Sequence, residues 1–178
     1  LGFAVNFPFV VFTDIANYFD SMPLQRLRNK LSGLGRFDET AIDLLFYLIE
    51  AFVWRPEYIP FSGTGLPQID FDAPRLLAHS YLYDIDNYIT QELKTEFVRW
   101  MDDFDFGVHS KAEGKRCLGL LNDELGSLGL SINEGKSRVL TGKQALEYLW
   151  TNENRRLTLL NRLIDNSSTP ALTGERVG

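Results

Sequence analysis

Three aspartates have the residue type and placement of a metal-dependent site. The segment RWMDDFDFG, residues 99–107, puts Asp102 and Asp103 side by side, and Asp14 ends the apolar run NFPFVVFTD of residues 6–14. Adjacent carboxylates repel each other unless a positive charge lies near them, and hard divalent cations prefer carboxylate oxygens. Two Mg²⁺ ions about 4 Å apart can activate an attacking oxygen and stabilise a leaving one, so the chemistry expected is in-line transfer at phosphorus. For the pair taken alone, a solvated turn is the alternative.

Composition excludes several other kinds of site. His79 and His109 have no Cys or His partner at metal-ligand spacing, which argues against structural zinc. The single cysteine, Cys117, excludes an internal disulfide and indicates a reducing cytosol, so we expect a cytoplasmic protein. No apolar run reaches the roughly 18 residues needed to span a bilayer, and no membrane association is expected. The net charge of −6 argues against a simple basic nucleic-acid-binding surface.

The first half of the chain predicts one strand followed by two helices. Residues 6–14 form an apolar, β-branched and aromatic run of strand length, which we expect to end near Asp14. Asp20 or Ser21 can cap the next helix, and Asp38 can start another. The apolar positions with helical spacing are Leu24, Leu27 and Leu31 in the first of these helices, and Ile42, Leu45, Ile49 and Phe52 in the second. Gly33 and Gly35 are expected to end the first.

The second half predicts a hairpin between helices. Residues 54–68 are dense in Pro and Gly and indicate a loop, and from Ala73 the pattern is helical again. Residues 97–100 and 104–108 are strand-like and are separated by residues 101–103. The next helix carries Leu118, Leu121, Leu125 and Leu128 and ends at Gly129. Short strands are expected at residues 130–133 and 137–141, then one or two helices and a mobile tail.

This order of elements predicts an α+β fold. Strand, helices, strand, hairpin, strand, helix and strand match the split β-α-β-β-α-β arrangement, with extra helices in the first crossover. We therefore expect an antiparallel sheet with helices packed on one face. In such a sheet the first strand and the hairpin are neighbours, so Asp14 is expected to lie close to the turn that carries Asp102 and Asp103.

Four stretches of the sequence, in order, resemble the palm motifs of reverse transcriptases, which are RNA-directed DNA polymerases. TDIANYFDSM resembles the first motif, GLPQIDFDAPRLLAHSYL the second, RWMDDFDF the Asp-Asp motif and LGLSINEGKSRVL the fourth. Together they span about residues 9–140. The split order described above is the order that the palm subdomain of these right-hand polymerases has. The resemblance implies nucleotidyl transfer from dNTPs to a growing DNA 3′ end.

The resemblance also implies roles for single residues. Asp14 and Asp102 would be ligands of two Mg²⁺ ions, for which Mn²⁺ can substitute, Asp103 would be a supporting carboxylate, and the backbone carbonyl of Ile15 a further ligand. Phe19 would lie under the sugar of the incoming nucleotide and exclude a 2′-hydroxyl, although periodicity alone fits a core aromatic. Gln68, in GLPQ, would approach nucleotide and template, and Lys136 would protonate the leaving pyrophosphate, with a solvated turn lysine as the alternative. Arg99 is expected to pair with a carboxylate or pack at the base of the hairpin.

The chain departs from the family pattern at Ile69, where many relatives have Gly, and this bulky side chain is expected to crowd the approach of the template to the backbone. The motifs look most like bacterial reverse transcriptases of the abortive-infection and other defence-associated groups, some of which polymerise without a template. We expect a palm over residues 1–142, with finger-side helices at 21–53, and over 143–178 a helical extension towards the thumb and a mobile tail.

The expected partners are dNTPs, an RNA or DNA template and primer, and the fingers and thumb of a longer parent protein. Without those parts the chain alone is expected to be inactive. The alternative from another class is a non-catalytic palm-fold interaction or scaffold module.

Overall fold

The computed structural model describes residues 6–53, 58, 63–69, 72–149, 157 and 160. Its strands are β1 (Phe9–Asp14), β2 (Phe97–Trp100), β3 (Asp103–Val108) and β4 (Arg138–Thr141). Its helices are α2 (Tyr18–Ser21), α3 (Leu24–Gly33), α4 (Glu39–Phe52), α5 (Asp72–Tyr81), α6 (Tyr83–Tyr88), the π-helix η1 (Ile89–Leu93) and α7 (Lys111–Ser127). Residues 142–149 are also helical. The predicted tail and most of the predicted 54–68 loop lie outside the described residues.

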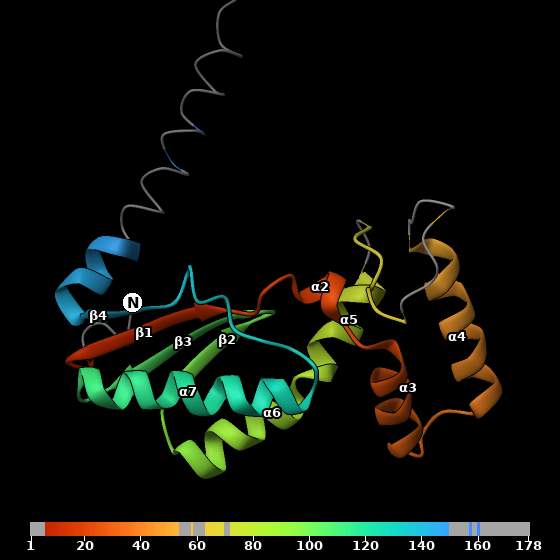
Figure 1. Cartoon of the computed structure of the whole chain (residues 1–178), viewed down its shortest axis with the longest axis horizontal. Coiled ribbons are helices and arrows are strands. Elements are labelled where there is room, and N and C mark those ends of the chain that lie inside the picture. The colour runs from red at the N-terminus through yellow and green to blue at the C-terminus, as the bar shows by residue number, and fades with distance from the viewer. Residues whose placement is uncertain are drawn as a thin grey trace, which may run out of the picture.

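The strands form one antiparallel sheet in the order β2-β3-β1-β4. Figure 1 shows this sheet at one end of an elongated molecule and the pair α3 and α4 at the other. The register of β1 against β3 pairs Asp14 with Asp103 and Phe12 with Asp105. The prediction of an α+β fold with an antiparallel sheet is confirmed, and β1 ends at Asp14 as expected.

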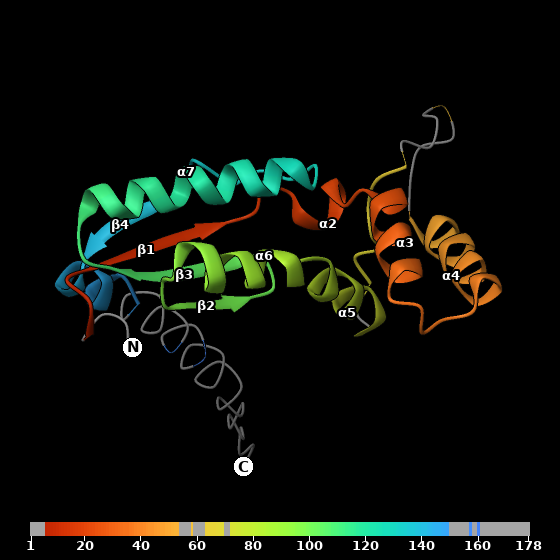
Figure 2. The same ribbon diagram turned by 90° about the horizontal axis from the view of Figure 1, so that it is seen from below.

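Helices α6 and α7 cover one face of the sheet, as Figure 2 shows from below. Alternate residues of β3, namely Phe104, Phe106 and Val108, are fully buried in the same core cluster as Leu121 and Leu125 of α7. The period of two in the sequence therefore identified the core face correctly. The opposite face is partly covered by residues 142–149, since Ala145 packs in a second cluster with Val10 and Phe12. Helices thus lie on both faces of the sheet, so the prediction of helices packed on one face is wrong: residues 142–149 cover part of the face that carries Asp14 and Asp103.

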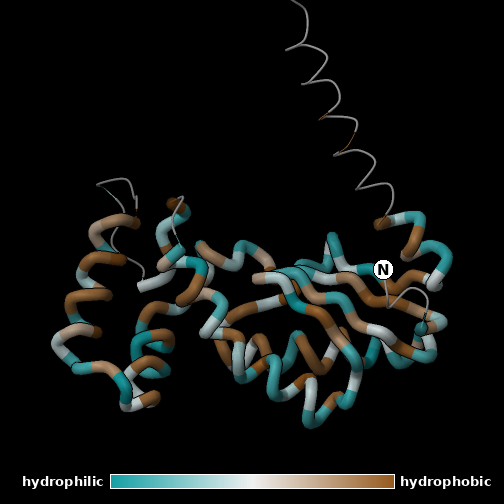
Figure 3. Tube along the Cα trace, turned by 180° about the vertical axis from the view of Figure 1, so that it is seen from behind, coloured by the Kyte–Doolittle hydropathy of each residue, from teal (hydrophilic) through white to brown (hydrophobic). Residues whose placement is uncertain are grey.

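Helices α3 and α4 follow their predicted apolar faces with one exception. Leu24, Leu27 and Leu31 are all buried in α3, and the side chain of Asp38 caps α4 by accepting a hydrogen bond from the Thr40 amide (2.9 Å). Phe52, predicted on the buried face of α4, is 58% exposed, because Ile42, Phe46 and Ile49 form that face and Phe52 lies at the open end. Figure 3, coloured by hydropathy, shows hydrophobic residues along much of α4 and along the strands.

Three local predictions are wrong. Asp20 and Ser21 do not cap α3: they belong to the one-turn helix α2, and Pro23 precedes α3 with no side-chain cap. Asp103 is the first residue of β3 rather than a turn residue, because it pairs with Trp100 and Asp14. Residues 130–133 form no strand; a single bridge joins Ile132 to Ile15.

Gly114 allows α7 to lie close against the sheet. A Cβ atom at this position would be 2.9 Å from a methyl carbon of Val11 and 3.0 Å from one of Val139. Because Gly114 has no Cβ atom, the backbone of α7 packs directly against the side chains of Val11 and Val139, and the helix lies close to β1 and β4. The same helix is capped by Ser110, whose hydroxyl accepts from the Glu113 amide (3.1 Å).

In the part of the chain that the structure describes, no helix combines the length and the apolar character that crossing a membrane requires.

Candidate active site

Asp14 is a buried carboxylate with one oxygen that has no partner. Its side chain is 7% exposed; Oδ2 accepts from Lys136 Nζ at 2.6 Å, whereas Oδ1 makes no hydrogen bond. The segment after α7 covers it, because the Asn133 amide donates to the Asp14 backbone carbonyl (2.7 Å). A buried carboxylate oxygen without a donor is costly, and a cation is the usual remedy.

Asp102 lies in the turn between β2 and β3. Met101, which precedes it, has φ +58°, a left-handed conformation that turns the chain sharply. The backbone carbonyl of Asp102 accepts from the Ile15 amide (3.1 Å), so the turn is bonded to the residue that follows Asp14. The predicted proximity of the hairpin turn to the end of β1 is therefore seen in the structure.

The carboxylates of Asp102 and Asp103 are repelled by the charge of Asp14. Burial raises the pKa of Asp102, and Asp14 raises it further, while the Lys136 ammonium acts in the opposite direction. The pKa of Asp103 is also raised, first by burial and then by Asp102 and Asp14. The negative charge of Asp14 thus makes ionisation of Asp102 and Asp103 harder, and a cation placed among the carboxylates would relieve this repulsion.

The carboxylates are not arranged as a finished metal cluster. Among the described residues, no group of three or more His, Cys, Asp or Glu side chains is positioned to hold a metal ion. The residues nevertheless suit a hard divalent ion, since the donors are carboxylate oxygens and Asp14 Oδ1 is buried without a partner. In this state the Lys136 ammonium is the only cation within ion-pair distance of Asp14 among the described residues.

A cavity of about 290 Å³ opens beside these groups. It is lined by Phe12, Thr13, Asp14, Trp100, Asp103, Asp105, Lys136, Tyr148 and Leu149. Asp105 was not predicted as a site residue, although its position two residues after Asp103 in a strand places both on one face. Burial raises the pKa of Asp105 to about 6, and Asp103 adds to the rise.

Lys136 lies in the turn before β4. Its amide donates to the Asn133 carbonyl (3.1 Å), and its side chain is 70% exposed apart from the contact with Asp14. That contact raises the pKa of Lys136. The sequence predicted a functional lysine here but gave no signal of its ion pair with Asp14, because the two residues are distant in the chain.

Phe19 and Gln68 line the same cavity, which is lined by residues different from those around Asp14 and is held together by two hydrogen bonds. The amide of Leu66 donates to the Phe19 carbonyl (2.8 Å), and Gln68 Nε2 donates to Asp20 Oδ1 (2.8 Å). Phe19 and Gln68 line a second cavity with Ile69 and Arg75. The structure thus joins the first and second predicted motifs, and this second cavity shares no lining residue with the cavity beside Asp14.

Comparison with known proteins gives one match and one absence. Residues 8–152 match the family model described as reverse transcriptase (RNA-dependent DNA polymerase). Comparison with curated protein sequences gives no match. The matched range includes all four stretches singled out from the sequence and every residue of the carboxylate cavity. Reverse transcriptases catalyse nucleotidyl transfer and generally use divalent metal ions. The chain belongs to the reverse transcriptase (RNA-dependent DNA polymerase) family.

Proposed function

We propose that this chain is the palm of a DNA polymerase that transfers nucleotides from dNTPs to a DNA 3′ end. The observation that carries the proposal is the buried, unpartnered Oδ1 of Asp14 beside two carboxylates whose pKa values are raised partly by Asp14 itself. The strand order β2-β3-β1-β4, with α7 leading into β4, supports a split β-α-β-β-α-β palm.

Asp14 and Asp102 would hold the metal ions, with Asp103 and the backbone carbonyl of Ile15 as further oxygen donors. Two Mg²⁺ ions, or Mn²⁺ in their place, would supply the charge that activates the 3′ oxygen and stabilises the leaving pyrophosphate. The Lys136 ammonium donates to Oδ2 of Asp14 and is otherwise exposed. It must leave this oxygen before both carboxylate oxygens of Asp14 can bind metal. Once released, Nζ would be free to donate its proton to the pyrophosphate.

Phe19 and Gln68 would select and place the incoming nucleotide. Their shared cavity, with Ile69 and Arg75, has room for a ring system, and the Leu66–Phe19 hydrogen bond fixes the loop against α2. Phe19 under the sugar would exclude a 2′-hydroxyl. Gly65, with φ +102°, provides the left-handed turn that starts this loop.

The template and the subgroup form a further part of the proposal. Ile69 is 37% exposed in the wall of the Phe19 cavity, where a bulky side chain narrows the approach of a template strand. The form of the motifs supports a bacterial enzyme of the abortive-infection or defence-associated kind, some of which act without a template, and Ile69 is compatible with either mode of synthesis. We further propose that residues 1–142 are the palm, with finger-side helices at 21–53, and that 143–178 extend towards a thumb.

The second candidate function is a non-catalytic palm-fold scaffold. Its support is the Lys136–Asp14 ion pair, which satisfies part of the buried charge without metal. The two functions differ in one measurement on the full-length protein, namely Mn²⁺ binding by calorimetry. A scaffold would bind neither Mn²⁺ nor dNTP.

The decisive test of catalysis is primer extension by the full-length protein with RNA, DNA or no template. Asp14→Asn and Asp102→Asn should each abolish dNTP incorporation, while Asp123→Asn, an exposed position on α7, should leave it unchanged. Full activity in both active-site variants would refute the proposal. Product formed equally without template would instead assign the untemplated mode.

A further inference from the structure

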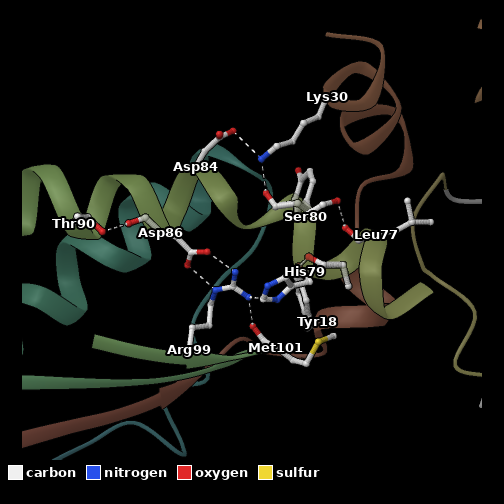
Figure 4. Close-up of polar contacts among 12 residues, drawn as sticks. Tyr18, Lys30, Leu77, His79, Ser80, Asp84, Asp86, Thr90, Arg99 and Met101 are labelled. Atoms are coloured by element: carbon white, nitrogen blue, oxygen red, sulfur yellow. Dashed lines mark hydrogen bonds and ion pairs between the residues drawn. The ribbon is translucent and has the colours of Figure 1, made fainter. Parts of the chain in front are cut away.

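Arg99 is a buried cation that joins helices α5 and α6 to the Asp-Asp turn. Its side chain is 3% exposed. Nε and Nη2 donate to the two carboxylate oxygens of Asp86 (2.6 and 2.5 Å), and Nη1 lies 3.1 Å from His79 Nδ1 and 3.0 Å from the Met101 carbonyl oxygen, to which it donates. Figure 4 shows the guanidinium between the α5–α6 region and the turn. The prediction that Arg99 pairs with a carboxylate is confirmed.

The anchor of this guanidinium is rigid. A two-oxygen contact with Asp86 fixes both the position and the plane of the guanidinium, which a single-point ammonium contact cannot do. The centroid of the Phe104 ring lies 5.9 Å from the guanidinium carbon. Arginine has only donors, so Nη1 is the donor in the contact with His79 Nδ1.

The contact with Met101 acts directly on Asp102. The Met101 carbonyl belongs to the peptide group that leads into Asp102, and the Asp102 carbonyl, which accepts from the Ile15 amide, belongs to the next one. Both peptide planes that flank Asp102 are therefore held, one by Arg99 and one by β1. Because Met101 adopts φ +58°, which most residues avoid, the turn needs such a restraint to keep one conformation.

We propose that Arg99 is a positioning residue that sets the direction of the Asp102 carboxylate towards Asp14. It does so by clamping the Met101–Asp102 peptide to helix α6 through Asp86. The inference rests on the proposed function for its catalytic consequence, while the clamp itself can be tested without activity. A structural ion pair elsewhere in the chain, Arg28 with Glu39 and Asp43, provides the matched comparison.

The chain has only two methionines, and they give a direct spectroscopic test. Met101 lies in the clamped turn, and Met22 is fully buried in the main core. In ¹³C-methyl-methionine spectra of the full-length protein, with any other methionine signals assigned by substitution, Arg99→Lys should shift or broaden the Met101 signal and leave Met22 in place. Arg28→Lys should move neither signal.

Function provides the second readout. Arg99→Lys should lower kcat for dNTP incorporation by about 10- to 100-fold with KM for dNTP nearly unchanged, and should weaken Mn²⁺ binding, because a small displacement of Asp102 spoils the geometry. Asp86→Asn should change the Met101 signal and kcat in the same direction as Arg99→Lys. If Arg99→Lys also disturbs the Met22 signal, and so unfolds the core, the result for Asp86→Asn tests the inference instead. An unmoved Met101 signal with wild-type kcat overturns the inference. A wild-type protein that incorporates no dNTP refutes the proposed function alone, since the Met101 comparison still tests the clamp.

Discussion

Neutralising Asp14 should make the metal-free protein more stable while it removes the proposed activity. In Asp14→Asn the buried Oδ1 is replaced by a group that can donate to the neighbouring carboxylates after an amide flip, and repulsion on Asp102 and Asp103 falls. Leaving a buried acceptor unpaired costs about 1–3 kcal/mol. The lost charge on the contact with Lys136 offsets little of this, because that ammonium is 70% exposed.

The expected gain is therefore about 1–2 kcal/mol in the free energy of unfolding. For a domain of this size, that corresponds to a rise of roughly 3–6 °C in Tm. Divalent metal should reverse the order. A ligand present at about 100 times its Kd stabilises the folded state by about 2.7 kcal/mol, and only the wild-type protein keeps the Asp14 ligand.

The assay is thermal unfolding in EDTA and then over a series of Mg²⁺ concentrations. We expect the Asp14→Asn curve to lie above wild type in EDTA, to stay nearly flat with Mg²⁺, and to be crossed by the rising wild-type curve. Asp123→Asn, at an exposed position on α7, should follow wild type throughout. A variant less stable than wild type in EDTA, or one that gains stability from Mg²⁺ equally, would refute the reasoning about the unpaired oxygen.

Three further predictions concern other residues. Because burial raises the pKa of Asp105 to about 6 from 3.8, the folded state binds its proton more tightly than the unfolded state, so the unfolding free energy of the metal-free protein should fall from about pH 4 to pH 6. Asp105→Asn should remove about 1–2 kcal/mol of that fall in urea titrations, after allowance for partial exposure; an unchanged profile contradicts this. Gly114→Ala should be less stable than Gly119→Ala by about 1–3 kcal/mol in the same assay, since both gain helix propensity but only position 114 meets Val11 and Val139; equal values would exclude the close contact. Phe19→Ala should reduce discrimination between dNTP and NTP in competitive incorporation, with total activity retained, and unchanged discrimination would mean that Phe19 is a core residue only.

Periodicity predicted the elements that position the site. The spacing of Leu24, Leu27 and Leu31 gave α3, and the alternation of Phe104 and Phe106 gave the buried face of β3, because both patterns follow from burial on one side of a regular element. The end of β1 at Asp14 followed from the change from apolar to polar residues. These signals depend only on residues that are close in the chain, so a single sequence is enough to detect them.

Features set by tertiary contacts could not be predicted in this way. The left-handed conformation of Met101 has no signal in its residue type, since left-handed turns favour Gly or Asn. The one-turn helix α2 was hidden because Asp20 and Ser21 resemble caps for the helix that follows. The proximity of Asp14 to the hairpin was predicted, but the pairing of Asp103 directly opposite Asp14 was not, because it depends on the register of β1 with β3.

The contacts that cover Asp14 have a consequence for folding during synthesis. Lys136, which pairs with Asp14, lies 122 positions further along the chain, and Ser137, which bonds to Thr13, lies 124 positions beyond it. Contacts of such separation close late, because a long loop must be ordered before they form. During synthesis, β1 therefore leaves the ribosome well before β3, β4 and the lysine turn that complete its surroundings. Until Lys136 is synthesised, the apolar strand β1 ends in an Asp14 carboxylate without its ion-pair partner. The last strand of the sheet to be synthesised therefore arrives together with the lysine that pairs with this carboxylate.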